Sequence, residues 1–298
     1  MKELKLGVIG LSEGNGHPYS WSAICNGYDS KYMKECPFPV IFDYLEEQSF
    51  PEAQLDGVRV THIWTQDQKI SENVARASKI ENIVGDYKDM IGDIDALLLA
   101  RDDAETHFEM AKPFLEADLP VYIDKPVALS TQDLQNIMEL KRFPGQIFSC
   151  SALQFSKELE LSSNDQAKLG DIKRIYGKTP KSWDKYAVHI IEPILRMFDY
   201  QSDIAEHSIN KNDDGIVSNS FSFKNGIEIT LEAYGANVTP IEIRVEGTKS
   251  ELVLRFSDSF TAFREAIRLF ILGINEKRDI IEESFLRKTV ELIERGRS

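Results

Sequence analysis

Short apolar runs alternate with segments of helical period through the first half of the chain. Four runs have the length of strands, and the third is almost wholly apolar, as expected where helices cover both faces of a sheet. This alternation predicts βαβ units and a parallel sheet. The predicted strands are residues 4–11, 58–65, 95–100 and 121–123.

Local signals place helices between these strands. Pro18 suits the first turn of a helix, and Gly27 is a stop signal. Ser71 and Ser130 are candidate N-caps, the second strengthened by Asp133 three residues later. The predicted helical segments are 19–26, 71–78, 86–92, 105–116 and 130–142.

The segment 28–57 stands outside this alternation. It is rich in proline, aromatic and acidic residues, whereas a plain βαβ unit needs only about 30 residues in all. We therefore expect a surface insertion or a lid.

From residue 146 onward the pattern changes to longer strands of alternating character. Asn225 and Gly226 between two of them are a hairpin signal, because Asn-Gly readily adopts positive φ. A helix is expected at 187–198, and a final helical region at 260–295. We predict a parallel α/β domain at 1–125 and an α+β domain at 126–298. The strands predicted in the second half are 147–154, 172–178, 216–223, 227–234, 241–247 and 252–256.

Composition is that of an ordinary globular protein, with 298 residues, 42% hydrophobic and 28% charged. The net charge of -14 argues against a nucleic-acid partner, because it repels a phosphate backbone. No apolar run approaches the ~20 residues that span a bilayer. The amino terminus lacks the pattern of a signal peptide, so we expect a cytoplasmic protein without membrane contact.

Cysteine and histidine spacing gives no sign of a metal site. The three cysteines match neither a zinc site nor a redox pair, so free thiols are expected. His189 begins the predicted helix in the second half, where a lone histidine is more often a hydrogen-bonded core residue than a catalyst. The other four histidines have no metal-ligand spacing.

A glycine-containing turn joins the first strand to the first helix. The fingerprint G-x-G-x-x-G is not met, because Ser12 and Asn15 stand where its second and third glycines would follow Gly10. Ser12 is small enough for a pyrophosphate to approach, and Gly14 and Gly16 suggest a longer turn. These residues fit a nucleotide loop and an ordinary strand-to-helix turn equally well.

An acid after the second strand would bond the ribose of NAD. Thr65 stands nearest to that point and Asp67 follows two residues later, although a polar loop explains both equally well. Asp67 would repel a 2'-phosphate, so we expect NAD in preference to NADP.

Charged residues follow the carboxyl ends of the next two predicted strands. Open α/β sheets bind their ligands at this edge. Arg101 and Asp102 follow the third strand, although adjacent charges there are also typical of a solvated loop. Lys125 follows the fourth, before Pro126, which fixes the backbone direction. Its ammonium can donate a proton or a hydrogen bond to a substrate oxygen.

Together these pieces resemble the Gfo/Idh/MocA family of glucose-fructose oxidoreductase and inositol dehydrogenase. Asp93-Ile-Asp-Ala-Leu-Leu-Leu-Ala and the later Val-Tyr-Ile-Asp124-Lys125-Pro126 are similar to the family's DIDAV and EKP motifs, with Asp124 in place of Glu. Val188-His189-Ile-Ile-Glu192 is similar to its histidine-containing helix start. The resemblance implies a Rossmann-type, doubly wound parallel sheet followed by a large open mixed or antiparallel sheet.

The resemblance also implies a function. It implies NAD(P)-dependent oxidoreduction of a secondary alcohol on a sugar, cyclitol or related polyol, with Lys125 and His189 handling hydroxyl protons. The family's acid four residues before the histidine is absent, and Asp184 is the nearest carboxylate. The second domain is expected to form a homodimer or homotetramer. The residues expected to contact the cofactor are Gly10, Ser12, Gly14, Asn15, Gly16, Thr65, Asp67, Arg101, Asp102 and Lys125.

Departures from the family pattern lie in the cofactor and catalytic positions, and two other functions therefore stay open. One is a cofactor-depleted member of the fold that acts as a ligand sensor or regulatory partner. The other is a different reaction, such as hydrolysis or elimination assisted by bound NAD. The retained Lys125 and His189 favour the dehydrogenase.

Overall fold

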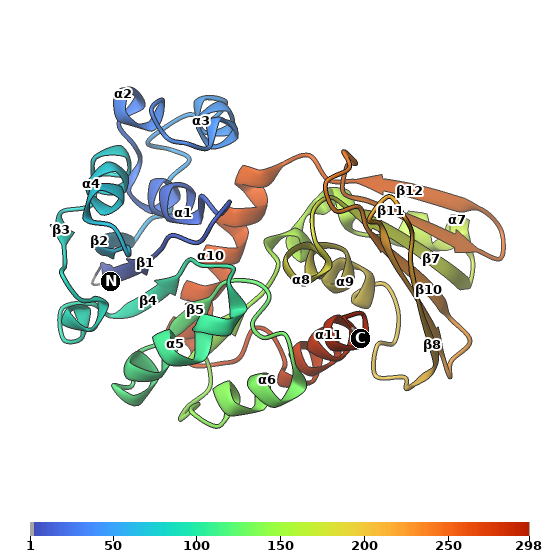
Figure 1. Ribbon diagram of the computed structural model, residues 1–298. Helices are drawn as coiled ribbons and strands as arrows, with labels where there is room; N and C mark the ends of the chain where they lie inside the picture. Colours follow the sequence, from blue (N-terminus) through green and yellow to red (C-terminus); the bar gives the residue numbers. More distant parts are fainter. Residues whose placement is uncertain (1–2, 298) are drawn as a thin grey trace. The chain divides into compact units, whose positions relative to one another are not determined.

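Residues 3–297, which the computed structural model of Figure 1 describes, fold around two six-stranded sheets. Met1, Lys2 and Ser298 lie outside the described residues. The chain divides into two compact units. Unit 1 comprises the chain as far as Val127, Gln135–Ser149 and Phe263–Ile280, and unit 2 comprises Ala128–Leu134, Cys150–Ala262 and the chain from Ile281 onward.

Sheet A of unit 1 is parallel throughout, with strand order β3-β2-β1-β4-β5-β6. The order reverses between β1 and β4, which is the switch point of a doubly wound sheet and the place where such sheets bind ligands. The predicted Rossmann-type sheet is thus confirmed. Its strands are β1 Leu4–Ile9, β2 Val58–Trp64, β3 Asn82–Ile83, β4 Ala96–Leu99, β5 Val121–Ile123 and β6 Ile147–Ser149.

Helices cover both faces of sheet A, as Figure 1 shows. Right-handed crossovers on the two sides of the switch point put α1 and α5 on opposite faces. Trp21 of α1 stacks on Tyr122 of β5 with ring centroids 4.5 Å apart, and Tyr122 meets Phe270 of α10 at 5.7 Å. Helices α1 and α10 therefore share one face. The helices are α1 His17–Asn26, α4 Gln68–Ala77, α5 His107–Glu116, α6 Thr131–Met138 and α10 Ser259–Glu276.

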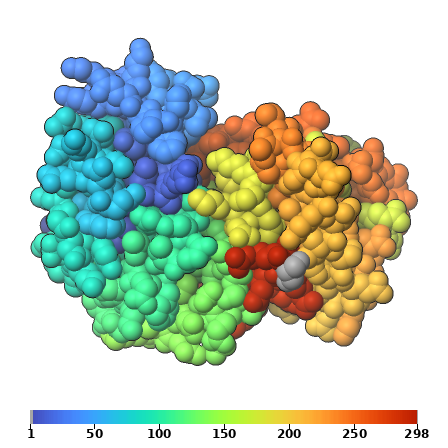
Figure 2. Space-filling model, viewed as in Figure 1, coloured from blue at the N-terminus to red at the C-terminus, as the bar shows by residue number. Residues whose placement is uncertain are grey.

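The segment 28–57 forms two short helices at the surface of unit 1, α2 Ser30–Met33 and α3 Pro39–Glu46, drawn in blue in Figure 2. Met33 and Leu45 are fully buried, so the segment packs on unit 1 through apolar side chains. Arg264 of α10 donates to the carbonyl oxygen of Ala53 at 2.9 Å. These contacts hold segment 28–57, which was expected to be a surface insertion or a lid, on unit 1.

Sheet B of unit 2 is mixed, with strand order β12-β11-β7-β10-β9-β8. Strands β7 and β10 are parallel, and the other neighbours are antiparallel. The hairpin predicted at Asn225 and Gly226 joins β9 to β10, and Gly226 has φ 86°. The strands are β7 Ile172–Thr179, β8 Ile204–Lys211, β9 Val217–Phe223, β10 Glu228–Ala233, β11 Glu242–Gly247 and β12 Glu251–Arg255.

The two faces of sheet B differ. Its apolar set, including Ile229 and Leu231, is buried on the face that α9 (Val188–Leu195) covers. The other face carries charged pairs such as Arg174 with Glu228 at 2.9 Å. Alternation thus places the apolar residues of these strands inward and the charged residues outward.

Two predicted boundaries are wrong for local reasons, and a third segment is confirmed as helical with a break inside it. The strand expected at 147–154 ends at Ser149, because β6 pairs with β5 of sheet A and Ser151 then begins the 3-10 helix η3, Ala152–Phe155. Helix α4 is capped by Asp67, which accepts from Lys69 N–H at 2.8 Å, while Ser71 accepts from Thr65 N–H. The region 260–295 forms two helices, α10 and α11 (Glu283–Arg295).

Domain assignment also differs from the predicted division at residue 125. Gln135–Ser149 and Phe263–Ile280 cluster with unit 1 although they lie in the second half of the sequence. The reason is packing: β6 completes sheet A, and Phe270 of α10 meets Phe148 of β6 with ring centroids 5.8 Å apart. Within residues 3–297, no helix is both long and apolar enough to cross a membrane.

Candidate functional site

The turn from β1 to α1 depends on glycine for its close packing. A Cβ on Gly10 would lie 2.2 Å from Cγ of Pro18, so a larger residue would push α1 away from the end of β1. A Cβ on Gly16 would lie 2.5 Å from Cδ1 of Ile41, and Gly14 adopts φ 76°. Gly10 and Gly16 therefore allow close packing around the turn, at a spacing that the usual fingerprint does not describe.

Asn15 stands at the position of the third fingerprint glycine and is almost fully buried. Its Nδ2 donates to Oδ2 of Asp124 at 2.8 Å, and its Oδ1 accepts from His17 N–H at 2.8 Å. The second bond satisfies an N–H group at the start of α1 that has no partner within the helix. Asn15 therefore links the turn to the end of β5.

Asp124 is a buried carboxylate that holds several loop groups together. Nδ1 of His17 lies 2.6 Å from its Oδ2, and its Oδ1 accepts from Lys125 N–H at 2.7 Å. The His17 ring stacks on Trp21 at 4.8 Å. Sequence reasoning missed His17, although its place beside the glycine turn was a usable signal.

Ser12, Asp102 and Lys125 form a compact cluster at the carboxyl ends of β1, β4 and β5, and we call it the Lys125 cluster. Nζ of Lys125 lies 3.3 Å from Oδ2 of Asp102, whose Oδ1 accepts from Ser12 Oγ at 2.7 Å. All three residues are at most 5% exposed. The fold thus brings together three residues that the sequence singled out separately, and it pairs the buried ammonium with a carboxylate.

Thr65 and Asp67 both have structural partners. Oγ1 of Thr65 donates to the carbonyl oxygen of Asp67 at 2.7 Å, and Asp67 caps α4. Because a cap residue satisfies N–H groups at a helix start, both residues are accounted for by the local fold.

Gln66 lies between these two residues and bonds to the β1 turn. Its Nε2 donates to the carbonyl oxygen of Leu11 at 2.6 Å, and its Oε1 accepts from Leu11 N–H at 3.0 Å. Nη1 of Arg101 donates to the same Oε1 at 3.1 Å, while its Nε donates to Asp103 at 2.9 Å. An amide therefore stands near the place where an NAD-binding domain usually presents an acid.

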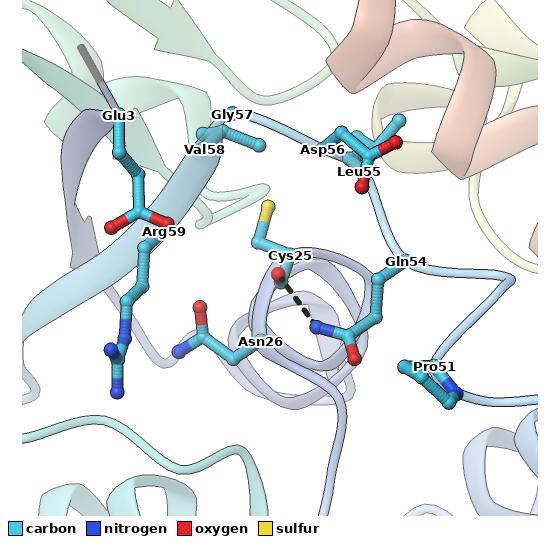
Figure 3. Close-up of a pocket in the computed structure, with 10 residues that line it drawn as sticks. All are labelled: Glu3, Cys25, Asn26, Pro51, Gln54, Leu55, Asp56, Gly57, Val58 and Arg59. Carbon is cyan, nitrogen blue, oxygen red and sulfur yellow. Dashed lines mark hydrogen bonds between the residues drawn. The ribbon is translucent and has the colours of Figure 1, made fainter.

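A pocket of about 410 Å³ opens at the opposite edge of sheet A, where β1 and β2 begin. Figure 3 shows Glu3, Asn26 and Arg59 around it, and Gln54 donating to the carbonyl oxygen of Cys25. Burial raises the pKa of the Cys25 thiol to about 12, so it is not a nucleophile at neutral pH. Since ligands of open α/β sheets bind at the carboxyl ends of strands, we assign no cofactor to this pocket.

The two predicted catalytic residues of unit 2 have different surroundings. His189 on α9 is buried, and its Nδ1 lies 2.8 Å from Oγ of Ser151. Asp184, in the short helix α8 (Trp183–Tyr186), is 41% exposed at its side chain and pairs with Nε of Arg297 at 3.1 Å. Asp184 and Arg297 line a second pocket, of about 470 Å³, in unit 2. Within the described part of the chain, no three His, Cys, Asp or Glu residues are grouped as metal ligands.

A family model matches part of the chain. Residues 44–151 match the Gfo/Idh/MocA oxidoreductase family. The family is described as an oxidoreductase family with an NAD-binding Rossmann fold, and the resemblance inferred from the sequence is confirmed. No curated protein matches the sequence.

Solved structures with the same two-sheet fold include inositol dehydrogenases. The apo scyllo-inositol dehydrogenase of Lactobacillus casei has a TM-score of 0.75 and 14% identity, over 99% of this chain and 96% of that chain. Its complex with NAD(H) and scyllo-inositol has a TM-score of 0.71, with 14% identity over 98% and 96%. The myo-inositol 2-dehydrogenase of Lactobacillus plantarum has a TM-score of 0.75 and 17% identity, over 98% and 95%.

Biliverdin reductase from Synechocystis, solved with biliverdin and NADP+, has a TM-score of 0.70 and 10% identity, over 98% of both chains. The TM-scores establish a shared fold, and identities this low leave substrate and cofactor choice to the residues of each chain.

Proposed function

We propose that this protein is an NAD(P)-dependent oxidoreductase that acts on a secondary alcohol of a sugar, cyclitol or related polyol. The observation that carries the proposal is the buried Lys125 ammonium, held 3.3 Å from Asp102 at the carboxyl edge of sheet A. A fixed cation at that edge can donate a hydrogen bond to the oxygen that gains or loses a proton as hydride moves. A solved neighbour that holds NAD(H) and scyllo-inositol supports the substrate class.

The residues around the β1 turn fit a dinucleotide. Gly10, Gly14 and Gly16 let the backbone and the start of α1 come close to a pyrophosphate, and the first turn of α1 carries no acid. The buried carboxylates nearby already have donors: Asp102 has the Lys125 ammonium at 3.3 Å, and Asp124 accepts from Asn15 Nδ2 and from Lys125 N–H. When bound, the nicotinamide would supply the hydride acceptor or donor.

We propose NAD in preference to NADP. Asp67 carries a negative charge beside the expected ribose position, and the Arg101 guanidinium is already paired with Asp103. Neither group offers a free cation to a 2'-phosphate, whereas the amide of Gln66 can bond ribose hydroxyls if it leaves Leu11.

Within unit 2, we propose His189 as the acid/base partner of the substrate hydroxyl. An imidazole can accept and donate a proton through its ring nitrogens, and this ring is held by Ser151 at 2.8 Å. Asp184 stays a candidate for substrate binding, because it pairs with Arg297 beside a pocket large enough for a sugar. We also propose a cytoplasmic homodimer or homotetramer that uses the outer face of sheet B, where charges of both signs make the face self-complementary.

One observation favours a second function. The Gln66 amide occupies both backbone polar groups of Leu11, which closes part of the turn in the manner expected of a cofactor-depleted sensor. Replacement of Gln66 by Ala separates the two: a dehydrogenase should still bind NAD, although more weakly by the lost amide–ribose bond, whereas a sensor should bind no NAD before or after the replacement.

Calorimetric titration with NAD, NADH and NADP tests the cofactor, and NADH formation with scyllo-inositol, myo-inositol and D-glucose tests the reaction. We expect NAD to bind, and at least one polyol to be oxidised. Absence of binding by all three nucleotides would overturn the dehydrogenase proposal in favour of the sensor, and clear preference for NADP would overturn the cofactor assignment.

A further inference from the structure

A buried serine at the start of η3 contacts His189. Oγ of Ser151 lies 2.8 Å from Nδ1 of His189, and Ser151 is fully buried. Leu153 N–H donates to the same Oγ at 3.3 Å. The hydroxyl therefore lies between the start of η3 and the imidazole, and its position is fixed from both sides.

Glu192 holds the backbone of that serine. Its Oε2 accepts from Ser151 N–H at 2.7 Å, and it lies three residues after His189 on the same face of α9. Helix α9 thus contacts Ser151 at two points, through the imidazole and through the carboxyl group. We call Ser151, Glu192 and His189 the His189 cluster.

A second donor completes the surroundings of Glu192. Nε2 of Gln154 donates to the same Oε2 at 2.6 Å, and Oε1 of Gln154 accepts from Nε of Arg196 at 2.8 Å. Glu192 is 2% exposed. Buried polar networks of this kind fix geometry only when their members are satisfied, and here the carboxyl oxygen, the serine N–H and the glutamine amide all have partners.

The hydroxyl suits an imidazole that changes protonation state. In the neutral tautomer that carries its proton on Nδ1, and in the protonated ring, Nδ1–H donates to Oγ, so this bond is kept while Nε2 gains or loses a proton. In the other neutral tautomer Nδ1 is unprotonated and accepts from the Ser151 hydroxyl. A hydroxyl therefore supports both states by rotation, whereas a carboxylate in its place would favour the charged ring. Because Nδ1 is held by Ser151, proton exchange with a substrate falls to Nε2.

We propose that Ser151, fixed in place by Glu192, is a positioning residue that sets the ring orientation and tautomer of His189. Its importance for turnover rests on the proposed dehydrogenase function. Its effect on the imidazole does not, because that effect needs neither cofactor nor substrate.

The test is long-range proton–nitrogen correlation NMR of the histidine rings in the whole chain, with His189 assigned by its absence in His189→Gln. In the wild type we expect one dominant neutral tautomer and a hydrogen-bonded Nδ1 shift at His189. Ser151→Ala should shift those nitrogen signals and change the tautomer ratio, while the matched control Ser149→Ala, a buried serine two residues earlier, should leave them unchanged.

Glu192→Gln keeps an oxygen that can accept from Ser151 N–H, so it should preserve the His189 signals. Wild-type ring-nitrogen shifts of His189 equal to those of a free imidazole would overturn the proposal, and so would unchanged shifts in Ser151→Ala. If that variant does not fold, the wild-type spectrum alone decides. In an active enzyme Ser151→Ala should lower kcat roughly tenfold with little change in KM, the rate equivalent of one neutral hydrogen bond. An NMR effect without any polyol oxidation would overturn the proposed function and keep the positioning role.

Discussion

The Lys125 cluster and the His189 cluster bury similar polar groups in different ways. In the first, the Asp102 carboxylate pairs with an ammonium and with a serine hydroxyl. In the second, the hydrogen bonds to Glu192 come from neutral donors, an N–H group and an amide. One cluster therefore balances charge against charge, while the other surrounds a carboxyl group with neutral partners.

The difference appears in the protonation of Glu192. Burial raises its pKa to about 8, against smaller lowering effects from the Ser151 N–H, the Arg196 charge and the Gln154 amide. At neutral pH the group is mostly uncharged, so the His189 cluster carries little fixed charge next to the imidazole. Removing a charged group from the Lys125 cluster should therefore lower the free energy of unfolding more than removing the carboxyl group of Glu192 from the His189 cluster.

The largest expected effect comes from Lys125→Met. Turnover of an accepted polyol should fall by at least about 10²-fold, because the general acid is lost. Stability should also fall, by about 3–5 kcal/mol, because Asp102 loses a buried cationic partner. Single-turnover rates and denaturant melts of the same variant measure both.

Asp102→Asn in the Lys125→Met background sharpens this test. The double variant should regain much of the stability and none of the turnover, since an amide needs no cation. Recovery of turnover would show that Lys125 serves only to balance Asp102.

The next largest expected effect is the change of stability with pH that Glu192 causes. The pKa of Glu192 is raised above its unfolded value, so the folded state holds the proton more tightly. Its contribution is fully present below about pH 4.5 and is lost as pH rises to about 8, amounting to a few kcal/mol at about 1.4 kcal/mol per pKa unit. Denaturant melts from pH 5 to 9 should show a smaller decline in Glu192→Gln than in the wild type, and equal declines would contradict a neutral Glu192.

Asn15→Asp should destabilise unit 1 by about 1–3 kcal/mol. It replaces an amide that donates to Asp124 at 2.8 Å by a second carboxylate, leaving two acids in contact in a buried place. Asn15→Ala separates the lost bond from the repulsion and should cost less. A melt in which the two variants are equal would show that Asp124 is not charged there.

The smallest effect is expected at Glu158, which serves as a contrast to Glu192. Burial raises its pKa, but hydrogen bonds from Ser156, from Ser257 and from Asp258 N–H outweigh this and bring it to about 2. Its stabilising contribution is present above about pH 4.5 and is lost as pH falls toward 2, opposite in sign to that of Glu192. Acid melts should show a smaller acid-induced loss for Glu158→Gln.

Local patterns were enough to predict most elements of both sheets. Period-two alternation identified β9, β10 and β11, and the apolar run at 95–100 identified β4. Strand β8 was missed because Ile204–Lys211 is largely exposed and polar, which removes the alternation that marks a half-buried strand. The sequence also singled out Ser12, Asp102 and Lys125, because residues after parallel strands meet at one edge.

Which of these residues bond to one another was decided by the tertiary structure. Asn15 and Asp124 are 109 positions apart, and Ser151 and Glu192 are 41 apart. Periodicity and capping signals report on neighbours a few residues away, whereas these bonds depend on how strands and helices pack. The same holds for Gln66, whose amide turned back to Leu11, and for residues 135–149 and 263–280, which joined unit 1 because buried aromatic contacts placed them there.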